Sequence, residues 1–151
     1  MAPISLTSRQ KLLLLFLSVD EDKLDPIRVQ KGMFIFGQEA PRNWIPTTER
    51  YKFVPYNFGP CSFELYDDLS MLEGLGLLNS ETIPGKSWNY YSLTKKGKGI
   101  IPEIMKSFPR ETYEFMIQIR QFLKKVTFDT LLKAVYKAYP EYAERSVFKN
   151  A

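Results

Sequence analysis

The chain has 151 residues, of which 44% are apolar and 15% aromatic, and its formal net charge is +4. This composition is that of one folded domain rather than a disordered segment. The single cysteine, Cys61, excludes an internal disulfide framework, and the lack of histidine excludes histidine-based acid–base chemistry and metal ligation. We therefore expect a cytoplasmic protein that is not an enzyme and binds no metal or cofactor.

Two helices are predicted in the first forty residues. The first covers about 8–19, and its central run, 12–17, is apolar on every face, as in a buried helix, but too short to span a bilayer. Three acidic residues, 20–22, follow at the end where the helix dipole disfavours negative charge, so the helix ends there. The second helix covers about 25–37, with Asp25 as its N-cap.

Residues 51–93 carry the pattern around which the chain is organised. An extended aromatic run, 51–58, lies at a sheet edge because Pro55 cannot donate a hydrogen bond to a ladder. A helical segment follows, and then two short apolar runs on either side of a turn at 83–86 predict a β-hairpin over 77–93. Strand, helix and hairpin in this order predict a winged helix-turn-helix. The helix, 62–73, has an apolar stripe formed by Leu65, Leu69 and Leu72.

The remaining chain is predicted to be helical. Thr94 is a suitable N-cap for a helix that Pro102 breaks or kinks, and a last helix follows Thr127. The expected fold is α+β and mainly α, with a small antiparallel sheet and additional C-terminal helices. We expect residues 1–108 to form the winged-helix domain and 109–151 to pack on it as an extension of a single folded unit.

Charge is distributed unevenly along the chain. Residues 61–82 hold five acidic residues and no lysine or arginine, whereas residues 83–110 hold six basic residues and one acidic residue. A DNA-binding winged helix usually lays its second helix in the major groove, where phosphates repel carboxylates. If DNA is bound, its backbone is therefore expected to contact the wing and the basic cluster that follows. The candidate residues are Arg28, Lys31, Lys86, Lys95, Lys96 and Lys98; the alternative is a solvated basic face.

The face of helix 62–73 opposite the leucine stripe is predicted to be acidic. It consists of Glu64, Asp67, Asp68 and Met71. Adjacent helical positions point about 100° apart, so Asp67 and Asp68 do not converge on one metal ion. A methionine among carboxylates is typical of an adaptable interface, which indicates a docking face for a protein partner.

Several blocks of the chain resemble one family. The blocks are 51–62, 65–72, 91–98 and 131–142, with Ser146. Together they resemble the YwgA-type family of small prokaryotic proteins, which is related in pattern to the Panacea (SocA-like) antitoxin domain. The resemblance implies a winged-helix-like fold of prokaryotic or phage origin, among relatives that neutralise toxins, regulate transcription or accompany defence systems. It implies no catalytic residues, and Cys61 departs from the larger residue of that family.

Two functional hypotheses follow. The first is a non-enzymatic, dimeric DNA-binding regulator or antitoxin-like factor that contacts duplex DNA through the wing and the basic cluster. The second is a protein-interaction module in a phage-defence or toxin–antitoxin assembly. It would dock on a toxin or defence subunit through the acidic helix face, without nucleic acid.

Overall fold

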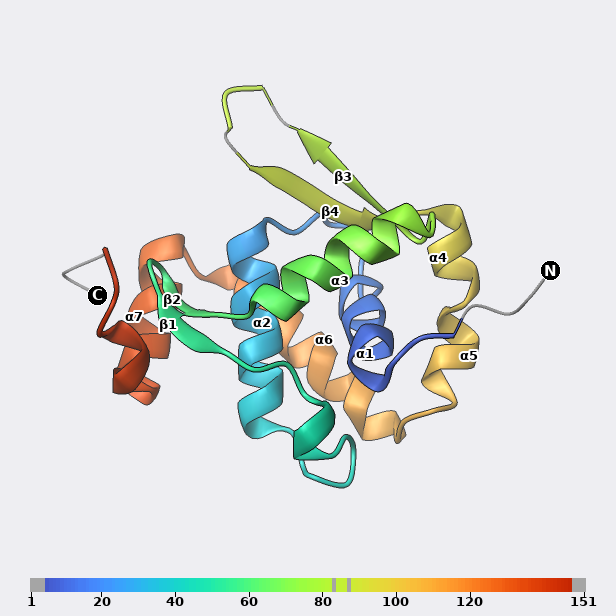
Figure 1. Cartoon of the computed structure of the whole chain (residues 1–151), viewed down its shortest axis with the longest axis horizontal. Coiled ribbons are helices and arrows are strands. Elements are labelled where there is room, and N and C mark those ends of the chain that lie inside the picture. Colours follow the sequence, from blue (N-terminus) through green and yellow to red (C-terminus); the bar gives the residue numbers. More distant parts are fainter. Residues whose placement is uncertain (1–4, 83, 87, 148–151) are drawn as a thin grey trace.

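The computed structural model describes residues 5–82, 84–86 and 88–147. It is α+β and mainly α, as predicted, with two small antiparallel hairpins set around a helical core (Figure 1). The helices are α1 (Ser8–Leu17), α2 (Pro26–Glu39), α3 (Phe63–Gly74), α4 (Lys95–Gly99), α5 (Ile101–Met105), α6 (Arg110–Lys125) and α7 (Phe128–Ala138), with 3₁₀ helices η1 (Thr47–Glu49) and η2 (Pro140–Ala143). The strands are β1 (Val54–Tyr56), β2 (Gly59–Cys61), β3 (Leu78–Thr82) and β4 (Asn89–Leu93).

Helix α1 lies at the centre of the core, as the sequence predicts (Figure 1). A capping box fixes its start, because the Thr7 hydroxyl accepts from the Gln10 backbone N–H and the Gln10 side chain accepts from the Thr7 N–H. Residues 12–17 are all buried, since α5, α6 and β4 pack around them. Helix α2 begins at its predicted N-cap, Asp25, and extends two residues past the predicted end, to Glu39.

The predicted hairpin forms the wing. Strands β3 and β4 pair antiparallel from Leu78 opposite Leu93 to Thr82 opposite Asn89; of the predicted tip, residue 83 lies outside the described residues. Leu24, between α1 and α2, bridges to Tyr91, and each backbone N–H donates to the other's carbonyl, at 3.1 and 2.8 Å. In a winged helix, a helix is followed by a bridging residue, two further helices and a hairpin, and this chain has the same order. Leu24 therefore lies beside β4 at the edge of the wing.

The prediction of one edge strand over 51–58 is wrong. The chain turns at Asn57 and Phe58, and β1 pairs with β2 in a separate hairpin. Gly59 makes this turn possible through its φ of 88°, in the left-handed region that favours glycine. Pro55 lies opposite Pro60, and because neither can donate, the ladder hydrogen bonds fall on the pairs on either side.

The C-terminal helices share the core of the N-terminal ones. Helix α6 packs on α1 and α2, and buried side chains of α6 and α7 belong to one hydrophobic cluster with those of α1 and α3. Arg120 of α6 is 1% exposed, and it donates to the Phe16 carbonyl, the Asp20 carboxylate and the Asp22 carbonyl. This arginine explains how acidic residues are tolerated after α1. The break that the sequence predicts near Pro102 falls at Ile100, between α4 and α5.

Within the described part of the chain, no helix combines the length and the apolar character that crossing a membrane requires.

Candidate functional site

Helix α3 occupies the position of the second helix in the helix-turn-helix, so its two faces decide what the protein can present to a partner. The Ser62 hydroxyl caps it by accepting from the Leu65 backbone N–H. The predicted leucine stripe is confirmed, because Leu65, Leu69 and Leu72 are at most 1% exposed. They fix the rotation of α3 about its axis.

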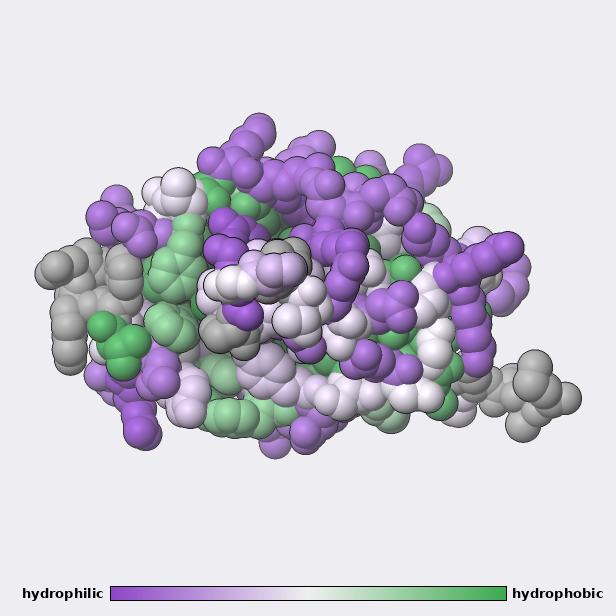
Figure 2. Space-filling model, turned by 90° about the horizontal axis from the view of Figure 1, so that it is seen from above, coloured by the Kyte–Doolittle hydropathy of each residue, from purple (hydrophilic) through white to green (hydrophobic). Residues whose placement is uncertain are grey.

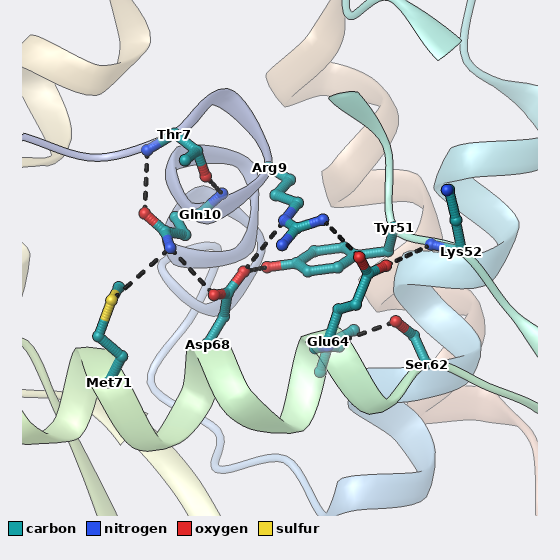
Figure 3. Close-up of polar contacts among 10 residues, drawn as sticks. Thr7, Arg9, Gln10, Tyr51, Lys52, Ser62, Glu64, Asp68 and Met71 are labelled. Atoms are coloured by element: carbon teal, nitrogen blue, oxygen red, sulfur yellow. Dashed lines mark hydrogen bonds and ion pairs between the residues drawn. The ribbon is translucent and has the colours of Figure 1, made fainter. Parts of the chain in front are cut away.

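Asp68 does not lie on an exposed acidic face, contrary to the sequence prediction. It is 6% exposed and points towards α1 (Figure 3). Its carboxylate accepts from Gln10 Nε2 at 2.9 Å and from the Tyr51 hydroxyl at 2.7 Å, and Arg9 Nε lies 3.3 Å away. Burial and the bond to Asp68 raise the pKa of Tyr51, so its hydroxyl remains a donor. Asp68 thus joins α3 to α1 and is not available to a partner.

Glu64 is turned the same way, since it lies one helical turn before Asp68. Its carboxylate accepts from the Lys52 backbone N–H at 3.0 Å and from Arg9 Nη1 at 3.1 Å (Figure 3). These two contacts, the backbone hydrogen bond first, hold the pKa of Glu64 below its usual range. Glu64 remains half-exposed, but its charge is already matched by Arg9.

The outward surface of α3 is therefore less acidic than its sequence indicates. Asp67 is exposed, as predicted, and Met71 is 39% exposed, with its sulfur 3.8 Å from Gln10 Nε2. Phe63, at the start of the helix, is 53% exposed. No lysine or arginine occurs on α3. Besides apolar surface, it offers the exposed carboxylates of Asp67 and Glu73, and that of Glu73 accepts a hydrogen bond from the Ser80 hydroxyl.

An exposed apolar surface that the sequence did not reveal adjoins this helix. We call it the hairpin patch; it consists of Val54, Tyr56, Phe58 and Phe63, which are 45%, 42%, 38% and 53% exposed. Val54 and Tyr56 share one face of β1 because strand side chains alternate. The Tyr56 and Phe63 rings meet edge to face at 5.4 Å, which joins the hairpin to α3. In Figure 2, hydrophobic side chains gather at the end of the molecule where this hairpin lies.

The aromatic run was visible in the sequence, but its exposure was not. Alternation along a strand places Val54, Tyr56 and Phe58 on one face, but it does not decide whether that face is buried or exposed. The structure decides this, because the hairpin lies against α2, α7 and η2 and leaves its turn residues, Asn57 and Phe58, exposed.

Two of the predicted DNA contacts are engaged inside the protein. Lys31 is 3% exposed and donates to the Pro60 carbonyl at 2.8 Å. Arg28 is half-buried; it pairs with Asp25 at 2.9 Å and donates to the Leu123 and Val126 carbonyls at the end of α6. The prediction that Lys31 is a surface residue is wrong, because the β1–β2 hairpin covers it. Arg28 remains partly exposed, but its guanidinium already binds Asp25 and the end of α6.

The other four candidates, Lys86, Lys95, Lys96 and Lys98, are exposed. Lys86 lies over the Trp88 ring, 5.5 Å from its centroid. Lys96 donates to the Leu75 carbonyl at 3.0 Å, and Lys98 pairs with Glu21 at 2.9 Å. These lysines lie along the wing and α4, and two of them already bind groups of the protein itself.

The exposed apolar patch beside α3 and the lysines of the wing are therefore two distinct candidate surfaces. No protein-family model matches the chain, and no curated protein matches it either.

Proposed function

We propose that this protein is a non-enzymatic interaction module of the antitoxin or phage-defence kind, which docks on a partner protein through the hairpin patch and the outward surface of α3. The observation that carries the proposal is the hairpin patch itself. Four large apolar side chains, each more than a third exposed, lie on the β1–β2 hairpin and at the start of α3, where the Tyr56 and Phe63 rings are in contact. Grouped exposure of this kind is typical of protein-binding surfaces, which are rich in aromatic residues and methionine.

Charge favours a protein over duplex DNA as the occupant. The second helix of a DNA-binding winged helix must approach phosphates, yet residues 61–82 hold no basic residue and Asp67 points outward. A partner with apolar side chains opposite the hairpin patch and a basic residue opposite Asp67 matches this surface. The resemblance to the YwgA-type family agrees with such a role, because relatives of that family neutralise toxins or accompany defence systems.

A photo-crosslinking experiment tests the proposal. A benzophenone amino acid at position 63 is expected to crosslink a partner in the source cells, and the double variant Tyr56→Ser, Phe63→Ser is expected to release that partner. The matched control is Trp88→Ser, which changes an aromatic residue of similar exposure, 41%, on the wing. Circular dichroism checks that all variants fold.

Retention of the partner by the double variant, or its release by Trp88→Ser alone, would contradict the proposal. A crosslinked species that sediments as a homodimer would show that the patch serves self-association, which the sequence also predicted, rather than a heterologous partner.

DNA binding is a second candidate function, favoured by one specific observation. The fold has a wing, and Lys86 and Lys95 are exposed on the wing and at the start of the following helix. Duplex DNA bound there would be held by phosphate contacts alone, so a gel shift at low salt should weaken steeply as salt rises. Lys86→Glu with Lys96→Glu is expected to abolish the shift; a wild-type protein that never shifts duplex DNA would rule this function out.

A further inference from the structure

A small pocket lies behind the hairpin patch, between α2, the β1–β2 hairpin and α3. Its volume is about 190 Å³. Tyr56 and Phe58 of the patch line it, together with Lys31, Cys61 and Tyr66. Pockets for drug-sized ligands begin at about 300 Å³, so this one has room for a group of side-chain size.

The buried ammonium of Lys31 makes the pocket chemically unusual. Only 3% of the residue is exposed, and its nitrogen donates to the Pro60 carbonyl at 2.8 Å. An ammonium group has three N–H donors. Among the described residues Lys31 forms no ion pair. A cation enclosed without a counter-ion is costly, and an anion entering the pocket would relieve that cost.

The titratable groups that face Lys31 do not supply the missing charge. Asp25, on the same helix, is paired with Arg28. Burial raises the pKa of the Cys61 thiol and raises that of Tyr66 to about 12, so both are neutral at pH 7. Burial also lowers the pKa of Lys31 to about 8, which leaves it mostly protonated at neutral pH.

We propose that this pocket binds a single carboxylate group carried on a short apolar or aromatic body, with Lys31 as its ion-pair partner. One ammonium matches the single charge of a carboxylate, whereas a phosphate dianion requires more donors. The aromatic and aliphatic walls match an apolar body. The inference is independent of the partner protein proposed above, because it is carried by the pocket and the buried lysine alone.

Calorimetry with 3-phenylpropionate tests the pocket, with 3-phenylpropanamide as the uncharged control. The acid is expected to bind at least about tenfold more tightly than the amide, as for a hydrogen-bonded ion pair. In ¹³C-lysine spectra the acid should raise the pKa of Lys31, and its affinity should fall as the pH rises above about 8. N-acetyl-alanyl-phenylalanine, as acid and as amide, shows whether the carboxylate of a peptide is accepted as well as a free one.

Two variants separate ligand binding from folding. Lys31→Met is expected to lose about tenfold or more in affinity for the acid, while the exposed Lys52→Met retains it. If Lys31→Met fails to fold, Ile27→Ala serves instead, because Ile27 lines the pocket but is not part of the hairpin patch. Equal binding of acid and amide, unchanged binding in the folded variants, tighter binding of inorganic phosphate, or no binding of any probe would each overturn the proposal.

Discussion

The two hairpins of this protein share a backbone arrangement and differ in what supports them. The β1–β2 hairpin has three-residue strands with two facing prolines, and it lies against α2, α7 and η2. The wing, β3–β4, has five-residue strands, and Leu78, Leu93 and the bridge to Leu24 hold its base. An isolated two-stranded hairpin is marginal in water. The first hairpin therefore depends on packing along its length, and the second on packing at its base.

The surfaces of the two hairpins also differ. The packed hairpin exposes Val54, Tyr56 and Phe58, while the wing exposes Trp88 among mainly polar residues such as Asn79, Glu81 and Lys86. A hairpin fixed along its length can present apolar side chains in one arrangement. This difference favours the packed hairpin over the projecting wing as the protein-binding surface that we propose.

Removing the support at the base of the wing should have the largest effect. A Cβ added at Gly97 would lie 2.0 Å from the Leu77 carbonyl oxygen, a backbone atom that cannot move aside. Gly97→Ala should therefore push α4 off the wing, weaken the Thr94 to Leu77 hydrogen bond and cost about 4 kcal/mol. Urea denaturation measures the loss. Gly99→Ala is the control, since nothing lies within 4 Å of its added Cβ; an equal loss there would show that the contact with Leu77 is not the cause.

The two turn glycines test the hairpins directly. Gly59 and Gly85 have φ values of 88° and 83°, so alanine is strained at both. At Gly59 the added Cβ would also lie 2.9 Å from Cε1 of the Tyr136 ring, whereas at Gly85 nothing lies within 4 Å. Gly59→Ala is expected to cost about 3 kcal/mol and Gly85→Ala about 1 kcal/mol. Thermal unfolding measures both losses of stability. Equal losses would show that packing of the β1–β2 hairpin does not make its turn more sensitive than that of the wing.

Lys31, which the β1–β2 hairpin covers, should make the free energy of unfolding depend on pH. The pKa of Lys31 falls from 10.5 to about 8 on folding, so between these values only the unfolded chain holds the proton. Stability should therefore rise with pH, by about 2 kcal/mol from pH 8 to 9.5. Lys31→Met should abolish the rise, which chemical denaturation at several pH values would measure. Measurements stay below about pH 10, because the raised pKa of Tyr66 reverses the trend above it. If stability still rises with pH in the variant, a titratable group other than Lys31 causes the rise.

The smallest effect is expected on the wing. Lys86 lies over the Trp88 ring in an exposed setting, so Lys86→Met should cost only about 0.5 kcal/mol. A double-mutant cycle with Trp88→Ala isolates the contact. A coupling several times larger would mean that the wing is held by more than its base.

Sequence reasoning located the helices because their ends are set by neighbouring residues. Thr7, Asp25, Thr94 and Thr127 each accept a hydrogen bond from a backbone N–H three residues later. Such a cap needs no distant partner, and the leucine stripe of α3 needs only helical spacing. The wing likewise follows from two apolar runs around a turn.

The candidate surfaces could not be predicted in the same way. Asp68 is buried by Gln10 and Tyr51, which lie 58 and 17 residues away in sequence. Lys31 is enclosed by a hairpin that the sequence presented as a single strand. Exposure depends on which distant elements pack together, and no local pattern of residues encodes that.

The helices, their caps, the core leucines and the wing can be read from the amino-acid sequence, because they depend on contacts between near neighbours. The sequence does not show which charges are exposed, which are paired inside, or that the aromatic run forms a surface patch with a lysine pocket behind it. These features follow from the long-range packing of α1, α2 and α3 against segments remote in the chain.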